Sequence, residues 1–265
     1  MREHRSNTFG GPRTRILYRV QEIIVYLETH ALSKNFGNLR ALSEVDLAIA
    51  NKQIYGIAGP NGAGKSTLFN VVAGLYSPSS GKVLFEGDNI TGWPPHRICH
   101  KGIGRTFQIP TAFHSISVRR NLESGMIFGG GSREFLTEVI ELLGLESKLD
   151  LPAENLDLWT TKLVMLGTVL TTGCKLLMLD EPMAGFSVHE IQRFVELVRN
   201  INKSFGTTIL IIEHLLDVLV ELVEKLLILD NGRVIAVGDP SEVIKDKRVI
   251  ESYLGGFEEK EDAFS

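Results

Sequence analysis

The distribution of hydrophobic residues along the chain predicts alternating strands and helices. From Ile24 to Ala50, apolar and polar residues alternate roughly as they do in strands, and residues 53–58 form a short apolar run that ends in a glycine-rich turn. After this turn, residues 66–73 carry apolar side chains at helical spacing, with Gly74 as a stop. The pattern predicts a buried strand that leads through a loop into a helix.

The second half of the chain continues the alternation. Residues 82–85, 176–179 and 207–212 are predicted strands. A helix is predicted between the last two, at residues 187–201, where apolar side chains recur every three or four positions. A strand, a crossover helix and another strand in this order are typical of a parallel sheet.

Two segments depart from this scheme. Residues 226–229 and 233–237 flank Asp230-Asn231-Gly232, which predicts a hairpin because Asn-Gly tolerates the positive φ angles of a type I′ turn. Residues 115–165 have a mostly helical pattern, with Gly129 to Gly131 as a flexible break. We therefore expect an α/β fold with a mostly parallel core sheet, an antiparallel β portion and an inserted helical subdomain.

The chain is expected to form one composite domain. An internal repeat with a period of 20 to 50 residues is not visible, which argues against solenoids and propellers. The expected division is an N-terminal extension at residues 1–20, a single domain at 21–257 made of a core (21–114 and 166–257) and the helical subdomain (115–165), and an acidic tail at 258–265.

Composition narrows the class of protein. Of 265 residues, 43% are hydrophobic and 23% charged, which is too apolar for a disordered chain. The formal net charge of −4 argues against non-specific binding of nucleic acid, and we expect no nucleic-acid partner. Cys99 and Cys174 lack the spacing of metal ligands and are interpreted as packing residues.

The chain carries no sign of membrane insertion. The most apolar stretch, residues 209–229, is interrupted by charged residues, and residues 1–15 lack the apolar region of a secretory signal. We therefore expect a cytoplasmic protein.

A phosphate-binding motif stands between the first buried strand and its helix. The segment fits G-x-x-x-x-G-K-[ST] with Gly59, Pro60, Asn61, Gly62, Ala63, Gly64, Lys65 and Ser66, followed by Thr67. Phosphates require backbone N–H groups at close range, which Gly62 and Gly64 permit because they have no Cβ. Lys65 is expected to reach the β- and γ-phosphates of a nucleotide, and the Ser66 hydroxyl to bind Mg²⁺. A turn that merely joined strand to helix would not require Lys-Ser.

Two acidic residues end the strand at 176–179. Asp180 and Glu181 would lie at the C-terminal edge of the sheet, where open α/β sheets bind ligands. We expect Asp180 to hold Mg²⁺, directly or through water, and Glu181 to act as general base on the attacking water. Alternatively, the two acids could cap the next helix.

With these motifs, the chain resembles the ATP-binding cassette (ABC) ATPases, which have a P-loop NTPase fold, from about Ile24 to Gly256. Gln108 in Arg-Thr-Phe-Gln resembles the Q-loop glutamine of that family, and His214 its switch histidine. Phe36 resembles the aromatic residue that stacks on adenine, and residues 184–187 occupy the D-loop position.

The resemblance implies an ATPase that binds ATP and Mg²⁺. It implies that Gln108 contacts Mg²⁺ and water and links them to the helical segment. It also implies that His214 senses the γ-phosphate, so that Lys65, Gln108, Glu181 and His214 together carry catalysis.

Within the family, the chain resembles the ATPase subunits of branched-chain amino acid importers. The resemblance rests on residues 104–110, 181–185, 212–214 and 249–255. Urea-importer and lipopolysaccharide-export ATPases carry similar motifs, so these alternatives stay open. The resemblance implies no direct contact between this subunit and the transported substrate.

One motif departs from the family pattern. Where family members carry Leu-Ser-Gly-Gly-Gln, this chain has Leu156-Asp-Leu-Trp-Thr160. The family's serine and glycine amides bind ATP on the opposite subunit, so that Asp157 would bring a negative charge near phosphate and Trp159 a large ring to a close backbone approach. A second, different ATPase subunit with an intact signature is therefore favoured as partner, and a homodimer with slow or no hydrolysis is the alternative.

The resemblance also implies a place at the membrane. The helical segment at 115–165 would dock on transmembrane permease subunits, which puts the chain on the cytoplasmic face of the membrane as a peripheral subunit. Two other functions remain open: a soluble ABC ATPase acting on nucleic acid or ribosomes, and a nucleotide-dependent interaction module with little hydrolysis.

Overall fold

A computed structural model describes residues 25–261, with side chains described for residues 25–254. The predicted N-terminal extension at residues 1–20 and the end of the predicted acidic tail, residues 262–265, lie outside the described residues. The described strands form two sheets, one of four strands and one of six.

The smaller sheet is antiparallel, with the order β2-β1-β4-β5. Its strands are β1 (Val25–Phe36), β2 (Leu39–Ala50), β4 (Ser80–Phe85) and β5 (Asp88–Asn89). In β2, Val45, Leu47 and Ile49 are buried while the residues between them are exposed. The alternation in this part of the sequence therefore reflects a sheet with one face on the core and one in solvent.

The larger sheet has the order β10-β9-β3-β8-β7-β6. Its strands are β3 (Ile54–Ala58), β6 (Ile103–Arg105), β7 (Leu176–Asp180), β8 (Thr208–Ile212), β9 (Lys225–Asp230) and β10 (Arg233–Gly238). Strands β6, β7, β8, β3 and β9 run parallel, and β10 pairs antiparallel with β9. Every residue of β3, β7 and β8 is buried, as expected for parallel strands that are covered on both faces.

The hairpin turn between β9 and β10 has the predicted conformation. Asn231 and Gly232 have φ angles of 45° and 74°, both positive as a type I′ turn requires.

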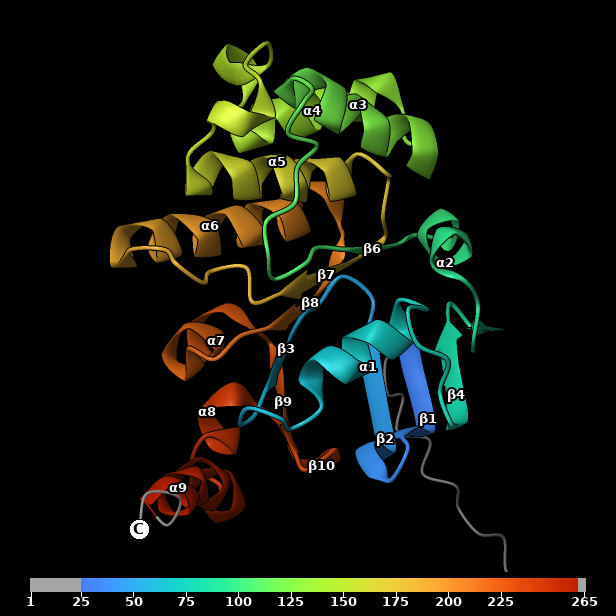
Figure 1. Cartoon of the computed structure of the whole chain (residues 1–265), viewed down its shortest axis with the longest axis vertical. Coiled ribbons are helices and arrows are strands. Elements are labelled where there is room, and N and C mark those ends of the chain that lie inside the picture. The colour runs from blue at the N-terminus through green and yellow to red at the C-terminus, as the bar shows by residue number, and fades with distance from the viewer. Residues whose placement is uncertain (1–24, 262–265) are drawn as a thin grey trace, which may run out of the picture.

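Helices cover the large sheet and extend beyond it (Figure 1). They are α1 (Lys65–Val72), α2 (Pro95–Lys101), α3 (Val118–Gly129), α4 (Arg133–Leu143), α5 (Leu158–Leu170), α6 (Val188–Phe205), α7 (Leu216–Leu222), α8 (Pro240–Val243) and α9 (Lys247–Glu261), with short 3-10 turns at Glu146–Lys148 and Ala153–Asn155. None of the helices within residues 25–261 is long and apolar enough to cross a membrane.

The two faces of the large sheet pack against different partners. On one face, Leu177, Leu179 and Ile211 join a core with the apolar side chains of α3 to α7. On the other face, Met178 and Ile212 join a second core with α1 and the antiparallel sheet. The large sheet is thus the middle layer, between helices α3 to α7 on one face and α1 with the antiparallel sheet on the other.

The middle of the chain is helical, as the pattern predicted. Helix α3 ends at Gly129, and Gly130 takes a φ angle of 88° before α4 starts at Arg133, which accounts for the glycine break. Helix α5 continues through residue 165 to Leu170, so the expected boundary between residues 165 and 166 falls inside a helix. At the other end of the chain, α9 reaches Glu261 and includes the first residues of the expected acidic tail.

Helix α6 begins one residue later and ends four residues later than predicted, at Phe205. Ser187 caps its N-terminus in a reciprocal pair of hydrogen bonds with Glu190. Asp180 and Glu181 therefore do not cap this helix, which removes the alternative interpretation of the two acids.

Candidate functional site

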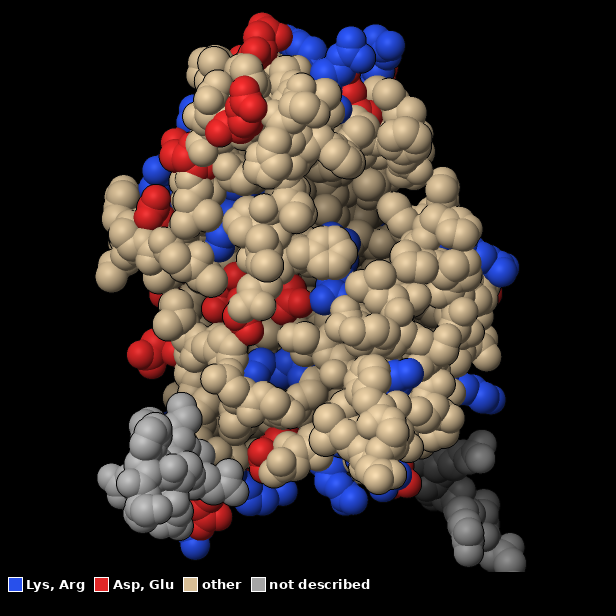
Figure 2. All heavy atoms as spheres, in the orientation of Figure 1, with Lys and Arg blue, Asp and Glu red and all other residues tan. Residues whose placement is uncertain are grey.

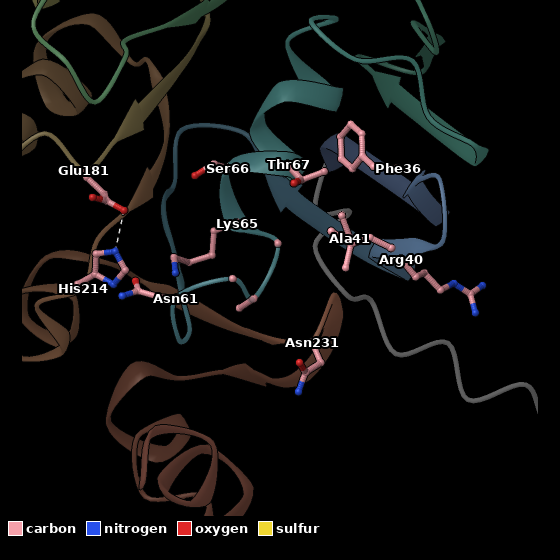
Figure 3. A pocket seen from close by; sticks show the side chains of 14 residues that line it. Phe36, Arg40, Ala41, Asn61, Lys65, Ser66, Thr67, Glu181, His214 and Asn231 are labelled. Carbon is pink, nitrogen blue, oxygen red and sulfur yellow. Dashed lines mark hydrogen bonds and ion pairs between the residues drawn. The ribbon is translucent and has the colours of Figure 1, made fainter. Parts of the chain in front are cut away.

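A cavity of about 460 Å³ lies at the C-terminal edge of the large sheet, beside the turn that joins β1 to β2 (Figure 3). It is lined by Phe36, Leu39, Arg40, Ala41, Asn61, Gly62, Ala63, Gly64, Lys65, Ser66, Thr67, Glu181, His214 and Asn231. The structure thus brings together residues 61–67 of the phosphate-binding motif, Glu181 after β7, His214 after β8 and Phe36 of β1, whereas Asp180 and Gln108 do not line the cavity.

The loop between β3 and α1 is held in shape by its surroundings. A Cβ on Gly59 would lie 2.0 Å from the carbonyl oxygen of Leu229, and one on Gly64 would lie 2.5 Å from that of Ala41. Ala63 O accepts a hydrogen bond from Gly232 N–H at 3.0 Å, and Gly232 O accepts one from Ser43 N–H at 2.8 Å. The backbone of the β3–α1 loop therefore packs directly against the backbone of β2 and of the β9–β10 turn.

Helix α1 presents its N-terminus to the cavity. Gly64 is the N-cap residue, with a φ angle of 104° and no side-chain hydrogen bond to the first amides, and the first turn has no acidic residue. Backbone N–H groups at a helix N-terminus, combined with the helix dipole, attract anions. The geometry fits the phosphate group that the motif predicted.

Lys65 lies inside the curve of this loop (Figure 3). Its ammonium group donates to the carbonyl oxygens of Gly59 at 2.7 Å and Pro60 at 2.9 Å. Burial lowers the pKa of Lys65, and the charges of Glu181 and Asp180 oppose that effect. Gly59 and Pro60, both predicted site residues, thus contact Lys65 rather than line the cavity.

Glu181 is held by two other predicted residues. His214 Nε2 lies 2.7 Å from Glu181 Oε1, and Gln108 Nε2 donates to Glu181 Oε2 at 2.6 Å. Only 15% of the Glu181 side chain is exposed, so both carboxylate oxygens are aligned in a partly desolvated position. Glu181 also has a φ angle of 46°, a left-handed conformation that is uncommon for a residue with a side chain.

Asp180 contacts an arginine that the sequence interpretation did not single out. Arg105 Nη2 donates to Asp180 Oδ2 at 2.8 Å, and its Nη1 donates to Asn70 Oδ1 at 2.6 Å. Both charged side chains are at least 92% buried. Burial raises the pKa of Asp180, while the hydrogen bond and charge of Arg105 oppose the rise. The one signal in the sequence was that Arg105 lies three residues before Gln108 in the Arg-Thr-Phe-Gln stretch.

Ser66, Asp180 and Gln108 are the residues predicted to bind Mg²⁺, and they differ in the contacts they make. Ser66 and Asp180 offer a hydroxyl and a carboxylate, the hard oxygen donors that Mg²⁺ prefers. Gln108 binds Glu181 through its amide nitrogen. The described side chains contain no cluster of three or more His, Cys, Asp or Glu that could hold a metal alone. The donor set therefore fits Mg²⁺ in the way Mg²⁺ usually binds, with phosphate oxygens and water as the remaining ligands.

Phe36 stands at the far side of the cavity from Glu181 (Figure 3). Its ring meets Tyr76 edge-on with 5.2 Å between centroids, and Lys34 Nζ lies 5.0 Å from its centroid. Phe36 is 41% exposed, so that a ring face remains available to a flat ligand.

The segment with the altered signature forms the start of α5. Asp157 is the N-cap residue, and its carboxylate accepts from Thr160 N–H at 2.7 Å. Trp159 packs on Phe186 with 5.0 Å between ring centroids, and the guanidinium carbon of Arg193 lies 4.6 Å from the Trp159 ring centroid. The Trp159 ring therefore packs between α5 and α6. Of the two altered residues, Asp157 is the one that would interfere with phosphate binding at the N-terminus of α5.

Charged side chains of both signs gather in the middle of the face that holds the cavity, while most of that face is uncharged (Figure 2).

Two family models match the chain. A model described as "ABC transporter" matches residues 42–184. A second, described as "Branched-chain amino acid ATP-binding cassette transporter", matches residues 233–259, which include β10 and most of α9.

Named relatives are similar over most of their length. The chain is 37% identical over 249 residues to the "Probable branched-chain amino acid transport ATP-binding protein LivG" of Archaeoglobus fulgidus, an alignment that covers 86% of this chain and 95% of the relative. It is 30% identical over 248 residues to the "High-affinity branched-chain amino acid transport ATP-binding protein LivG" of Escherichia coli K12, covering 86% and 97%.

A solved structure has a similar fold and related sequence. It is the ADP conformation of an ATP-binding cassette of an ABC transporter, 33% identical with a TM-score of 0.80, and the match covers 87% of this chain and 99% of that one.

Proposed function

Because the chain belongs to the ATP-binding subunits of ABC transporters, we propose that its cavity binds and hydrolyses ATP with Mg²⁺ to power the import of branched-chain amino acids. The observation that carries this proposal is the convergence of Lys65, Glu181 and His214 on one cavity of about 460 Å³. An anion-binding helix N-terminus forms one wall of that cavity, and the carboxylate of Glu181 forms part of the other.

ATP binding is assigned to the loop and the aromatic residue. The N–H groups at the start of α1 donate to the phosphate oxygens, and Lys65 turns its ammonium group from the Gly59 and Pro60 carbonyls to the β- and γ-phosphates. Phe36 stacks on the adenine. The solved ADP conformation of a related cassette supports a nucleotide in this family's site.

Hydrolysis is assigned to the groups around Glu181. Its carboxylate takes a proton from water as the water attacks the γ-phosphorus in line, and the bond from that phosphorus to the β-phosphate oxygen breaks, so that ADP leaves. His214 Nε2, 2.7 Å from Glu181 Oε1, orients the carboxylate, and Gln108 holds the other oxygen. The family resemblance implies that the His214 ring also senses the γ-phosphate. When bound, Mg²⁺ would neutralise charge on the phosphate oxygens, with Ser66 and Asp180 as its protein ligands.

The cargo is proposed from the relatives. Both named relatives are described as branched-chain amino acid transport proteins, and the second family model covers the C-terminal part of this chain. Urea import and lipopolysaccharide export remain the alternatives for cargo. No direct contact between this subunit and the transported substrate is proposed, because the cavity is accounted for by the nucleotide.

ABC ATPase subunits pair with permeases and dimerise. We assign the permease contact to the helical segment, where Ile127 and Phe128 at the end of α3 are 66% and 76% exposed. Large apolar side chains exposed next to each other on a soluble surface commonly mark an interface. This contact would hold the chain on the cytoplasmic face of the membrane as a peripheral subunit.

A different ATPase subunit is favoured as the second ATPase. The carboxylate of Asp157 accepts from the Thr160 amide in the first turn of α5, so this helix end offers a negative charge where the family binds the γ-phosphate of the opposite subunit. An ATP on the partner would therefore be bound weakly, while an intact partner signature would complete the cavity of this chain. A homodimer would contain two such weakened contacts.

Turnover with and without partners tests the proposal. The chain is purified alone, then with a second ATPase subunit that carries an intact signature, then with the permease, and Mg²⁺-dependent ATP hydrolysis is measured in each. Activity that needs the second subunit supports the heterodimer, and brisk activity of the chain alone, abolished by Glu181→Gln, would overturn it. ATP binding without hydrolysis in every combination would instead indicate a nucleotide-dependent module.

A further inference from the structure

The loop at residues 181–185 has an unusual backbone. Glu181 and Gly185, its first and last residues, have φ angles of 46° and 82°. A left-handed conformation at a residue with a side chain costs free energy and persists where the surroundings fix it. The contacts that fix residues 181–185 therefore also determine where the Glu181 carboxylate lies.

One of these contacts comes from helix α5. Lys162 is 3% exposed, and its ammonium group donates to the carbonyl oxygens of Pro182 and Ala184, each at 2.6 Å. It also lies 4.7 Å from the ring centroid of Phe186. A buried ammonium group is costly unless its protons are bonded, and here the bonds go to the backbone of this loop.

The second contact comes from the end of β8. Glu213 is also 3% exposed, and its Oε1 accepts from Met183 N–H at 2.8 Å. Its Oε2 accepts from His214 N–H at 3.3 Å. Burial raises the pKa of Glu213, and the hydrogen bonds from the Met183 and His214 amides oppose that rise. Burial lowers the pKa of Lys162, and the charge of Glu213 opposes that effect. Glu213 thus joins the loop to the segment that carries the histidine.

Together, the two side chains hold the loop through its main chain alone. Lys162 binds the carbonyl groups on either side of Met183, and Glu213 binds the Met183 amide between them. The loop contacts are therefore independent of the side chains at positions 182–184. They depend on the distance between α5 and the end of β8.

Helix α5 is in turn fixed to the other helices of its segment. Thr171, the residue after its last turn, donates through Oγ1 to Leu122 O of α3 at 2.9 Å. A Cβ on Gly167 would lie 2.6 Å from Leu122 and 2.8 Å from Leu143 of α4, so α5 packs closely against both helices. A displacement of this helical segment carries Lys162 with it.

We propose that Lys162 and Glu213 are positioning residues that hold Glu181 ready for hydrolysis, and that Lys162 transmits displacement of the helical segment to Glu181. The proposal rests on the proposed role of Glu181 as general base. Neither side chain contacts the reacting atoms, so the expected effect is on turnover and not on nucleotide binding.

The test compares Lys162→Met, Lys162→Arg and Glu213→Gln with the wild type in the complete transporter complex. We expect Lys162→Met to lower kcat by about 100-fold, the scale of a ~1 Å misplacement of a catalytic group, with unchanged affinity for ATP. Lys162→Arg keeps the charge and two donors and should recover part of the rate. The matched control is Lys175→Met, which removes an exposed lysine that binds Glu86 on the surface.

A second readout does not require activity. Hydrogen exchange of the peptide that spans residues 180–186 is measured for each variant, and it should accelerate in Lys162→Met and Glu213→Gln while the peptides of α6 and β3 are unchanged. Wild-type kcat in Lys162→Met, or unchanged exchange in this peptide, overturns the proposal. If Lys162→Met does not fold, the same two measurements on Glu213→Gln, which keeps the side-chain volume, decide it.

The two readouts also separate this proposal from the proposed function. A wild-type complex that binds ATP without hydrolysing it contradicts the role of Glu181 as base, and with it the catalytic part of this proposal. Faster hydrogen exchange of residues 180–186 in the variants would still support the conclusion that Lys162 and Glu213 fix the conformation of the loop.

Discussion

His214 and Glu181 face each other at the cavity, with 2.7 Å between Nε2 and Oε1. Gln108 holds the second carboxylate oxygen at 2.6 Å, so hydrogen bonds align the carboxylate from both sides. Alignment of this kind is what a general base requires, because its proton acceptor must already point at the attacking water.

Replacing the base tests this arrangement directly. Glu181→Gln keeps the shape of the side chain and removes its basicity, so that ATP hydrolysis should fall by at least about 100-fold while ATP binding is retained. Turnover of the complete complex and equilibrium binding of labelled ATP are the two measurements. Glu141→Gln, an exposed position on α4, is the control. Retained turnover in Glu181→Gln would rule out the base.

Lys65 should control binding itself. Lys65→Met removes the ammonium group inside the loop, and we expect ATP affinity to fall by about tenfold or more, since a charge-assisted hydrogen bond contributes roughly 1.5–3 kcal/mol. Binding is measured by titration with labelled ATP and Mg²⁺. Lys82→Met, which removes an exposed lysine of β4, should bind ATP as the wild type does. Unchanged affinity in Lys65→Met would contradict the phosphate site.

Phe36 should contribute to ATP binding by contact with the adenine ring and not with the phosphates. Phe36→Ala is expected to weaken ATP binding by about 1–3 kcal/mol, the range measured for stacking of a base on an aromatic ring. Inorganic tripolyphosphate has no base, and its binding should be the same in both proteins. Phe36→Tyr keeps the ring and should bind ATP normally. Equal losses for ATP and tripolyphosphate would point to a disturbed loop instead.

The cap of α5 predicts a pH-dependent contribution to stability. The N–H of Thr160, together with Lys148, holds the pKa of Asp157 below its usual value. A carboxyl group with a depressed pKa stabilises the fold above its unfolded pKa of about 3.9, and this stabilisation is lost as the pH falls through the folded pKa. At neutral pH, Asp157→Ala should lower the free energy of unfolding by about 1 kcal/mol.

Asp157→Asn separates the cap from its charge, because an amide caps a helix without titrating. The difference in unfolding free energy between wild type and Asp157→Asn should shrink from about pH 6 to about pH 3. A difference that stays constant over this range would contradict the depressed pKa.

Arg105 predicts a large effect on folding. Arg105→Met leaves Asp180 buried without its partner, which should lower the free energy of unfolding by about 3–5 kcal/mol in denaturant titrations. Asp180→Asn, added in the Arg105→Met background, should restore part of the loss because it removes the uncompensated charge. Arg119→Met breaks an exposed pair with Asp150 and should cost less than about 1 kcal/mol. Equal effects of the two arginine changes would contradict the buried pair.

The sequence predicted those parts of the fold that depend on local patterns. The buried strand before the phosphate loop, the hairpin at Asn231-Gly232 and the helix after Ser187 each follow from spacing or turn chemistry within a short stretch. The convergence of Lys65, Glu181 and His214 could be expected because parallel strands deliver their C-terminal ends to one edge.

The contacts around these residues could not be predicted in the same way. Arg105 and Asp180 are 75 positions apart, and Lys162 reaches a carbonyl 20 positions away. Neither lysine nor arginine has a local pattern that distinguishes a buried role from a solvated one. Their burial depends on how α5, β6 and β7 pack, and this is a property of the whole fold. Likewise, Trp159 could not be placed between α5 and α6 without knowing that Phe186 and Phe194 lie there.

The phosphate loop is joined at Ala63 O to the β9–β10 turn by the Gly232 amide, and Gly232 O of that turn accepts from Ser43 N–H of β2. Because neighbouring backbone holds the loop in this way, we expect little conformational entropy to be lost when the loop binds a ligand. A receptor of this kind should show nearly the same loop conformation whether empty or filled. In the proposed hydrolytic cycle, movement would then fall to other segments, such as the helical segment that carries Lys162.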